Sequence, residues 1–193
     1  MTKKILIINA HPYDQSLGTA IASAYEKGAK EAGAEVKRIN LYDLKFDPIL
    51  HKGYHEIQEL EPDLKMAQEA ITWAEHLVFV YPIWWLNIPA LFKGFIDRII
   101  LPGFGFKYAS SKLFPEKLLK NKSARLLVTM DAPVWFNWLM YGNGGKSSLC
   151  GGVLGFCGVG PVCCTNFDKV KFRGPKEIES WLKKAEQMGR RLK

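Results

Sequence analysis

Hydrophobic residues along this chain form short blocks with little polar alternation, each followed by a turn or a more polar stretch. The blocks at residues 3–10 and 77–81 are typical of parallel strands that are covered on both faces. Similar strand-like blocks occur at residues 36–41, 124–130 and 160–167. The pattern therefore predicts five strands in one buried sheet.

Helix-forming stretches separate these strands. They are expected at residues 20–32, 61–75, 89–98, 148–157 and from residue 175 onward. The last of them is amphipathic, with Ile178, Trp181, Leu182 and Ala185 on one face and lysines opposite. Alternating strands and helices predict an α/β fold with a doubly wound parallel sheet, helices on both faces and a single domain over residues 1–193.

Residues 82–89 join the central strand to its helix. The two prolines at the ends of this segment stop the strand and favour a first helical turn. Ile83, Trp84, Trp85 and Leu86 follow the carboxyl end of the strand, where open α/β sheets bind ligands. Two adjacent tryptophans there indicate a flat aromatic ligand, although two indoles packed in the core would give the same pattern.

The loop after the first strand has the features of an anion site. Ser16, Gly18 and Thr19 stand just before the first helix. Backbone N–H groups and the positive end of that helix would face a phosphate, and the two hydroxyls would add donors. Ordinary N-capping of the helix by Ser16 is the alternative explanation of the same residues.

Two other phosphate-binding patterns are absent from the sequence. The first loop has no G-x-G-x-x-G, so a Rossmann site for a dinucleotide pyrophosphate is not indicated. Residues 142–147 resemble the end of a Walker motif, but Met140 occupies the position of its first glycine. A P-loop NTPase is therefore not expected.

Aromatic residues follow the strand at residues 124–130. Residues 131–133 lead into residues 134–141, which we expect to form an aromatic loop beside the Trp84–Trp85 loop. Residues 99–108 are rich in glycine and aromatic side chains, so they are expected to form a surface excursion over the sheet edge rather than a helix.

The formal net charge of +8 comes from lysines and arginines scattered over predicted helix faces. Such a surface could attract anionic nicotinamide nucleotides, a membrane surface or nucleic acid. No arginine-rich run or RNA-binding aromatic motif supports nucleic acid. No apolar run approaches the roughly 20 residues of a membrane span, and residues 1–4 lead into a strand rather than a signal peptide. We therefore expect no nucleic-acid partner, no integral membrane segment and a cytoplasmic location.

The four cysteines are Cys150, Cys157, Cys163 and Cys164. They lack paired metal-ligand spacing, and the adjacent pair is poorly placed for a disulfide. We expect reduced thiols in the core and no metal site.

Three of these segments occur together in an order known from one family. The first loop at residues 11–18, the run at residues 81–98 and the strand end at residues 129–132 resemble the flavodoxin-like NAD(P)H:quinone oxidoreductases, the DT-diaphorase family with its bacterial relatives. The resemblance covers nearly the whole chain, and P-x-x-W-x-x-x-P-A-x-x-K-G in the second segment is its most specific part. It implies a flavodoxin-like fold that binds FMN or FAD.

The resemblance also implies which residues hold the flavin. They are His11, Ser16, Leu17 and Gly18 for the phosphate and ribityl chain, Pro82, Ile83, Trp84, Trp85 and Leu86 for one side of the isoalloxazine, and Thr129, Met130, Asp131 and Ala132 for its pyrimidine edge. Backbone N–H groups of the two later loops would bond the flavin and stabilise its reduced, anionic form.

Two departures from the family pattern affect this expectation. Residues 130–133 replace the family's two-glycine turn, so Asp131 would bring a negative charge near the flavin and lower its potential. The family's proton-relaying tyrosine and histidine have no clear counterpart, because Leu139 stands where the histidine belongs. Tyr141 is the nearest candidate for a catalytic proton donor, and packing against Trp138 is the alternative.

The implied activity is that of a flavin-dependent NAD(P)H dehydrogenase. Hydride would pass from NADH or NADPH through flavin N5 to a quinone or similar acceptor in two alternating half-reactions. Two other functions remain open, a flavodoxin-type electron carrier and an ancillary subunit of a membrane transport system, like those of potassium efflux systems. Flavodoxins are usually acidic, whereas this chain is basic.

Members of the family are commonly dimers, so the resemblance also implies a homodimer. The chain has more aromatic residues near the expected site than one flavin needs. We expect the surplus to close the site from a neighbouring subunit, or else simply to cap the sheet. The residues concerned are Phe104, Phe106, Trp135, Phe136 and Trp138.

Overall fold

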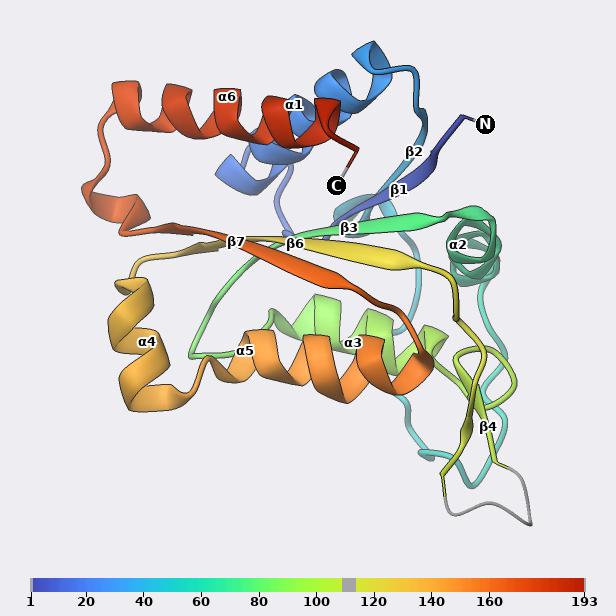
Figure 1. The fold of residues 1–193 in the computed structure, drawn as a ribbon. Helices are drawn as coiled ribbons and strands as arrows, with labels where there is room; N and C mark the ends of the chain where they lie inside the picture. The colour runs from blue at the N-terminus through green and yellow to red at the C-terminus, as the bar shows by residue number, and fades with distance from the viewer. Residues whose placement is uncertain (1, 109–113, 193) are drawn as a thin grey trace.

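A computed structural model describes residues 2–108 and 114–192, and over these ranges the chain forms a five-stranded parallel sheet between two layers of helices (Figure 1). The strands are β1 (Lys4–Asn9), β2 (Glu35–Asn40), β3 (His76–Pro82), β6 (Ser123–Met130) and β7 (Val162–Asp168). Their spatial order is β2-β1-β3-β6-β7. The order changes direction between β1 and β3, which is where sheets of this kind bind ligands.

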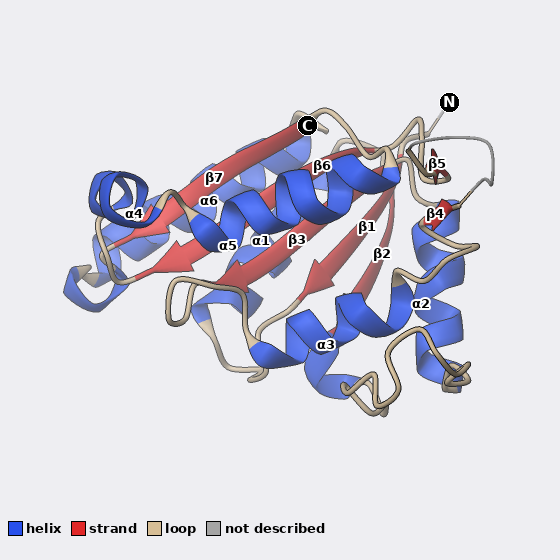
Figure 2. Cartoon of the chain, turned by 90° about the horizontal axis from the view of Figure 1, so that it is seen from below, coloured by secondary structure: helices blue, strands red, loops and turns tan. Residues whose placement is uncertain are grey.

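Helices cover both faces of the sheet (Figures 1 and 2). One face carries α1 (Leu17–Glu31) and α6 (Pro175–Arg190), and the other carries α2 (Pro62–Trp73), α3 (Ala90–Ile99), and α5 (Gly144–Ser147), which continues into the π-helical segment η2 (Ser148–Gly155). Helices α1 and α6 approach so closely that a Cβ at Gly28 would lie 2.0 Å from the carbonyl oxygen of Glu186. Glycine is therefore required at this crossing.

The three central strands β1, β3 and β6 are buried on both faces, as their uninterrupted hydrophobic blocks predicted. The outer strands β2 and β7 are only partly buried, so the prediction of five buried strands was wrong for these two. Ile5 and Ile7 of β1 pack toward α1 and α6, while Leu6 and Ile8 pack toward α2 and α3. Every residue of β3 is buried. The predicted doubly wound α/β fold with helices on both faces is confirmed.

Residues 134–141 form a helix, α4 (Val134–Tyr141), so the expectation of a loop was wrong. Pro133 precedes the helix and Gly142, with φ +60°, ends it in the left-handed conformation. The segment is apolar almost throughout, so it lacked the polar alternation that would have indicated a helix.

The expectation that all four cysteines are core thiols was wrong for Cys163. All four are free thiols, and Cys157 is buried, but Cys163 is exposed. Cys163 lies on β7, an edge strand of the described sheet, where alternate side chains face outward.

A small two-stranded sheet lies outside the main one. It pairs β4 (Phe106–Lys107) with β5 (Glu116–Lys117). Two short 3₁₀ turns, η1 (Leu41–Asp43) and η3 (Val170–Phe172), complete the described elements. Within residues 2–108 and 114–192, none of the helices has the length and apolar character needed to cross a membrane.

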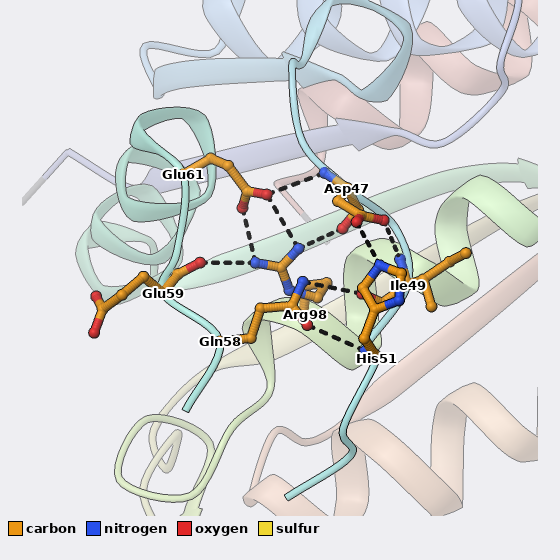
Figure 3. Close-up of polar contacts among 7 residues, drawn as sticks. All are labelled: Asp47, Ile49, His51, Gln58, Glu59, Glu61 and Arg98. Atoms are coloured by element: carbon orange, nitrogen blue, oxygen red, sulfur yellow. Dashed lines mark hydrogen bonds and ion pairs between the residues drawn. The ribbon is translucent and has the colours of Figure 1, made fainter. Parts of the chain in front are cut away.

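Residues 44–61 form no helix or strand and are held on α3 by Arg98 (Figure 3). The fully buried guanidinium donates to both carboxylate oxygens of Glu61, at 3.1 and 2.9 Å. It also donates to the carbonyl oxygens of Asp47 and Glu59. These bonds fix an otherwise irregular segment against the helix.

Gly94, one helical turn before Arg98, lies against the same segment. A Cβ at this position would lie 2.5 Å from both the Cβ and the carbonyl oxygen of Pro48. The second half of the family-like motif therefore positions residues 44–61 rather than a ligand.

Candidate cofactor-binding site

A pocket of about 330 Å³ opens at the carboxyl ends of β1, β3 and β6. It brings together residues from all three loops that the sequence analysis singled out. The predicted residues that line it are His11, Ser16, Leu17, Gly18, Pro82, Ile83, Trp84, Thr129, Met130 and Asp131. The volume lies at the lower end of the range for small-molecule sites.

Four predicted site residues do not line this pocket: Trp85, Leu86, Ala132 and Tyr141. The Trp85 side chain is 98% exposed at the tip of its loop. Tyr141 ends α4, and its ring contacts Phe136 with centroids 5.8 Å apart.

The first loop places the start of α1 at the pocket. Ser16 is the N-cap, and its Oγ accepts the N–H of Thr19 at 3.1 Å, as the capping interpretation predicted. Among the described residues, no group accepts a hydrogen bond from the N–H of Leu17 or of Gly18, and both residues line the pocket. The first turn carries no acidic residue, so these donors and the helix end present a positive potential that no carboxylate of the turn opposes.

Gly18 leaves space that a ligand could use. A Cβ there would lie 3.5 Å from Ser16 Oγ and 3.6 Å from His11 Cβ, which are ordinary contact distances. Packing within the protein therefore does not require glycine at this position. The absence of a Cβ instead opens the backbone of the pocket wall to a phosphate or ribityl chain, so the site fits such a group.

Asn9, which the sequence analysis did not single out, holds the first loop in place. The residue is fully buried, and its Nδ2 donates to Thr19 Oγ1 at 2.9 Å. Its Oδ1 accepts the N–H of His11 at 3.5 Å. The carboxyl end of β1 is thereby tied to both sides of the loop.

His11 lines the pocket beside the aromatic wall. Its ring lies edge-on to Trp84, with centroids 5.5 Å apart and planes at 78°. Burial lowers the pKa of His11, opposed by a hydrogen bond with the Tyr13 carbonyl that raises it. In the tautomer whose Nδ1 accepts the Tyr13 N–H, at 3.1 Å, the neutral ring offers an Nε2–H donor.

The second loop is a tight two-residue turn with backbone strain. Trp84 and Asn87 exchange hydrogen bonds at 2.9 and 3.0 Å. Between them, Trp85 and Leu86 have φ values of 49° and 64°. Bulky residues at positive φ cost about 1–2 kcal/mol each, and hairpin turns of this kind normally carry Asn-Gly. Such strain is commonly found at functional sites.

Two contacts brace this strained turn. Ile83 donates its N–H to the carbonyl of Thr129 at 2.8 Å, which joins the second loop to the third. Gly145 of α5 donates its N–H to the carbonyl of Leu86 at 3.0 Å. A Cβ at Gly145 would lie 3.1 Å from Asn87 Cα and 2.8 Å from Ile83 Cδ1, so glycine lets α5 approach the turn without displacing these atoms.

The third loop carries a carboxylate at the pocket. Asp131 lines the pocket, and its Oδ1 accepts the N–H of Lys171 at 3.0 Å. This bond ties η3 to the pocket rim and accounts for Val170 among the lining residues. The negative charge of Asp131, which the sequence analysis expected in this region, is thus present at the pocket.

Sequence reasoning missed two lining residues, Tyr13 and Val170. Tyr13 lies within the first loop and could have been included with its neighbours. Val170 follows β7, whose carboxyl end lies at the same edge of the sheet as the other three strand ends.

Comparisons with known proteins agree with this architecture. A family model described as a flavodoxin-like fold matches residues 3–192. A Haemophilus influenzae protein named as an uncharacterized NAD(P)H oxidoreductase is 32% identical over 162 residues, which cover 80% of this chain and 78% of the relative. The NAD(P)H dehydrogenase (quinone) 1 of Cavia porcellus is 29% identical over 148 residues, which cover 66% of this chain and 53% of the relative. The chain thus spans about half the length of that second relative.

Solved structures show the same fold. An NAD(P)H:quinone oxidoreductase from Methanothermobacter marburgensis superposes with a TM-score of 0.82 at 23% identity, covering 100% of both chains. An FMN-dependent NADH-azoreductase from Bacillus anthracis, solved in complex with FMN, gives a TM-score of 0.74 at 21% identity, covering 99% of both chains. At these identities the likeness shows that the fold is flavodoxin-like.

Proposed function

The chain belongs to the flavodoxin-like NAD(P)H oxidoreductase family, and from that premise we propose that it is a flavin-dependent NAD(P)H dehydrogenase that reduces a quinone or similar acceptor. One observation carries the proposal. Among the described residues, the pocket combines N–H donors of Leu17 and Gly18 that have no acceptor with the aromatic wall of Trp84 at the carboxyl edge of the sheet. A molecule with a phosphate at one end and a flat ring system at the other matches that combination.

Residues of the chain supply binding and alignment. Leu17 and Gly18 would hold the phosphate, and Pro82, Ile83 and Trp84 would flank the ring system. When bound, the flavin accepts hydride from the nicotinamide and passes it to the acceptor. The nucleotide and the acceptor would use the same open face in turn, so that catalysis depends mainly on the alignment of stacked planes.

Charge at the pyrimidine edge would tune the cofactor. Asp131 places a carboxylate at the pocket, where it disfavours a reduced, anionic flavin and lowers its potential. The small pocket supports FMN over FAD, as does the azoreductase neighbour that was solved with FMN. Either NADH or NADPH is compatible with the site.

Tyr141 is the proposed proton donor for the acceptor half-reaction. Its phenol does not line the pocket, so it would act only on an acceptor that projects toward α4. Tyr141→Phe should then slow reduction of the quinone while leaving reduction of the flavin by the nucleotide unchanged.

We also propose a homodimer, through the exposed aromatic surface next to β4. The structure separates the surplus aromatic residues of the sequence analysis, so they do not act as one set. Phe106 is buried within β4, beside the exposed Tyr54 and Tyr108, whereas Trp135 and Trp138 belong to α4 at the other edge of the sheet (Figure 1). A monomer by light scattering at micromolar concentration would contradict this assembly.

Anaerobic stopped-flow spectroscopy tests the proposed reaction. Protein loaded with flavin is mixed with NADH or NADPH, and the visible flavin band is expected to bleach with at least one of them and to return when a quinone is added. A flavin that stays oxidised with both nucleotides would contradict the proposal.

Gly18→Ala tests the location of the site. The added Cβ meets only ordinary contacts, so the free energy of unfolding should not fall, whereas affinity for FMN should fall because the Cβ occupies ligand space. Gly151→Ala is the matched control, since a Cβ there meets nothing within 4 Å. Equal flavin affinities in the two variants would place the flavin elsewhere.

A further inference from the structure

A ring of hydrogen bonds joins β1, β2 and α1 behind the first loop of the pocket. The fully buried Asn9 of β1 donates from Nδ2 to Thr19 Oγ1 at 2.9 Å and to Asn40 Oδ1 of β2 at 3.5 Å. Arg38 of β2 donates to the same Asn40 oxygen at 2.8 Å and to Ser23 Oγ at 2.8 Å. The Ser23 hydroxyl in turn donates to the carbonyl oxygen of Thr19 at 2.9 Å. The first turn of α1 is therefore held at both the side chain and the carbonyl of Thr19.

The charged group of Arg38 fixes the direction of these bonds. A guanidinium only donates, so the Asn40 atom that faces it is the amide oxygen. Asn40 Nδ2 then donates to the carboxylate of Asp43 at 3.0 Å. Because Asn40 Oδ1 is an acceptor, Asn9 presents its Nδ2 to β2 and to α1, and its own Oδ1 accepts the N–H of His11. Each amide thus has a single orientation.

The same direction continues through two hydroxyl groups to the pocket. Because Asn9 donates to Thr19 Oγ1, the hydroxyl hydrogen of Thr19 is available to its nearer acceptor, Ser16 Oγ at 3.1 Å, rather than to the Tyr13 carbonyl at 3.5 Å. Ser16 Oγ also accepts the N–H of Thr19 at 3.1 Å. With both lone pairs of its oxygen used, Ser16 keeps an O–H that has no acceptor among the described residues. Ser16 lines the pocket, so this O–H is available to an anionic ligand.

We propose that Asn40, which does not line the pocket, is a positioning residue for the phosphate end of the bound flavin. It acts through Asn9 and Thr19 and makes the Ser16 hydroxyl a hydrogen-bond donor to that phosphate. Successive bonds in such a chain polarise one another, and this chain starts at the positive charge of Arg38. The identity of the ligand rests on the proposed function, whereas the chain of hydrogen bonds is a property of the protein alone.

Titrations of the flavin-free protein with FMN and with riboflavin test this role. Riboflavin has the same ring system and ribityl chain but no phosphate, so the ratio of the two dissociation constants isolates the phosphate end. Asn40→Ala should weaken FMN binding by about tenfold, as for the loss of one hydrogen bond to a charged group, and should leave riboflavin binding unchanged. A general loosening of the fold would weaken the binding of both ligands.

Ser123→Ala is the matched control. It also removes a hydrogen bond from a buried side chain, because Ser123 Oγ lies 2.7 Å from Nδ1 of the buried His76. These two residues lie at the amino ends of β6 and β3, at the opposite end of the sheet from the pocket. The ratio of the FMN and riboflavin dissociation constants should be the same in this variant as in the wild type.

A double-mutant cycle tests the route through the hydroxyl group. If Asn40 acts through Ser16, Asn40→Ala should change the ratio little in protein that already carries Ser16→Ala. Equal changes in the two backgrounds would overturn the proposal, as would an Asn40→Ala variant that keeps the ratio of the wild type. Circular dichroism checks that each variant is folded.

Inorganic phosphate separates this inference from the proposed function. In the flavin-free protein, the NMR signals of the Leu17 and Gly18 N–H groups should shift on addition of phosphate, and Asn40→Ala should need about tenfold more phosphate for the same shift. This result in a protein that binds no flavin would contradict the proposed function and support the positioning role. A wild type that responds to neither phosphate nor FMN would overturn both.

Discussion

The chain at the two ends of helix α3 differs in burial and in backbone strain. Beyond its N-terminus, the turn between Trp84 and Asn87 exposes an indole to solvent and holds two bulky residues at positive φ. Near its C-terminus, Arg98 is fully buried and paired with Glu61. The run at residues 81–98 thus contains a strained, exposed turn that borders the pocket and a buried end, paired with Glu61, that fixes residues 44–61. The buried polar groups that have partners maintain the structure, whereas the strained, exposed turn is available to a ligand.

Removing Arg98 should give the largest effect, and the effect should be on stability. Arg98→Ala leaves the Glu61 carboxylate and two backbone carbonyls without their donor, so the free energy of unfolding should fall by about 3 kcal/mol. Urea denaturation measures this change. Lys93→Ala, which breaks the exposed Lys93–Asp97 pair, should cost less than about 1 kcal/mol. Equal losses in the two variants would contradict an anchoring role for Arg98.

Gly94→Ala should have the next largest effect. The new Cβ would overlap Pro48, whose backbone cannot move without disturbing the segment held by Arg98, so a loss of about 1–3 kcal/mol is expected. Gly151→Ala adds the same atom in open space and should not destabilise the fold. FMN affinity of folded Gly94→Ala should match that of the wild type, and a selective loss of affinity would contradict the division of α3 into two ends.

Lowering the pH should weaken the ion pair between Glu61 and Arg98, which holds residues 44–61 on α3. Burial would raise the pKa of Glu61, but hydrogen bonds from the Asp47 N–H and from Arg98 outweigh it and lower that pKa below 4.5. The stabilisation is therefore present above pH 4.5 and is lost as pH falls through the lowered value. The difference in unfolding free energy between wild type and Glu61→Gln should shrink as pH falls below 4.5. A difference that does not change with pH would contradict this account.

Leu86→Gly should have the smallest effect on the free energy of unfolding, and it should raise that free energy rather than lower it. Glycine relieves the cost of positive φ at this position, and the greater freedom of the unfolded chain offsets part of the gain. We expect stabilisation by about 0.5 kcal/mol together with weaker FMN binding, because a more flexible turn would position Trp84 less firmly at the pocket. Thermal unfolding and a flavin titration measure the two quantities. Destabilisation would show that the Leu86 side chain contributes more to packing than its strain costs.

The strands and most helices could be predicted because their pattern is local. Uninterrupted apolar blocks indicated β1 and β3, and the loops after them contain most residues that line the pocket. Helix α4 was not predicted, because its residues are apolar on nearly every side and their pattern therefore shows no helical period.

Other features depend on contacts between distant parts of the chain. Val170 reaches the pocket because Asp131 holds the neighbouring Lys171 N–H, forty residues away in sequence. The role of Arg98 likewise depends on Glu61 and on carbonyl groups that no local pattern connects to α3. Such long-range pairs could not be read from composition or periodicity.

The flavin site is tested most directly by titrating the flavin-free protein with FMN and with FAD and monitoring the quenching of flavin fluorescence. We expect one flavin to bind saturably per chain, with weaker binding in Gly18→Ala and unchanged binding in Gly151→Ala. A folded protein that binds neither flavin would contradict the assignment of the pocket at β1, β3 and β6 as a flavin site.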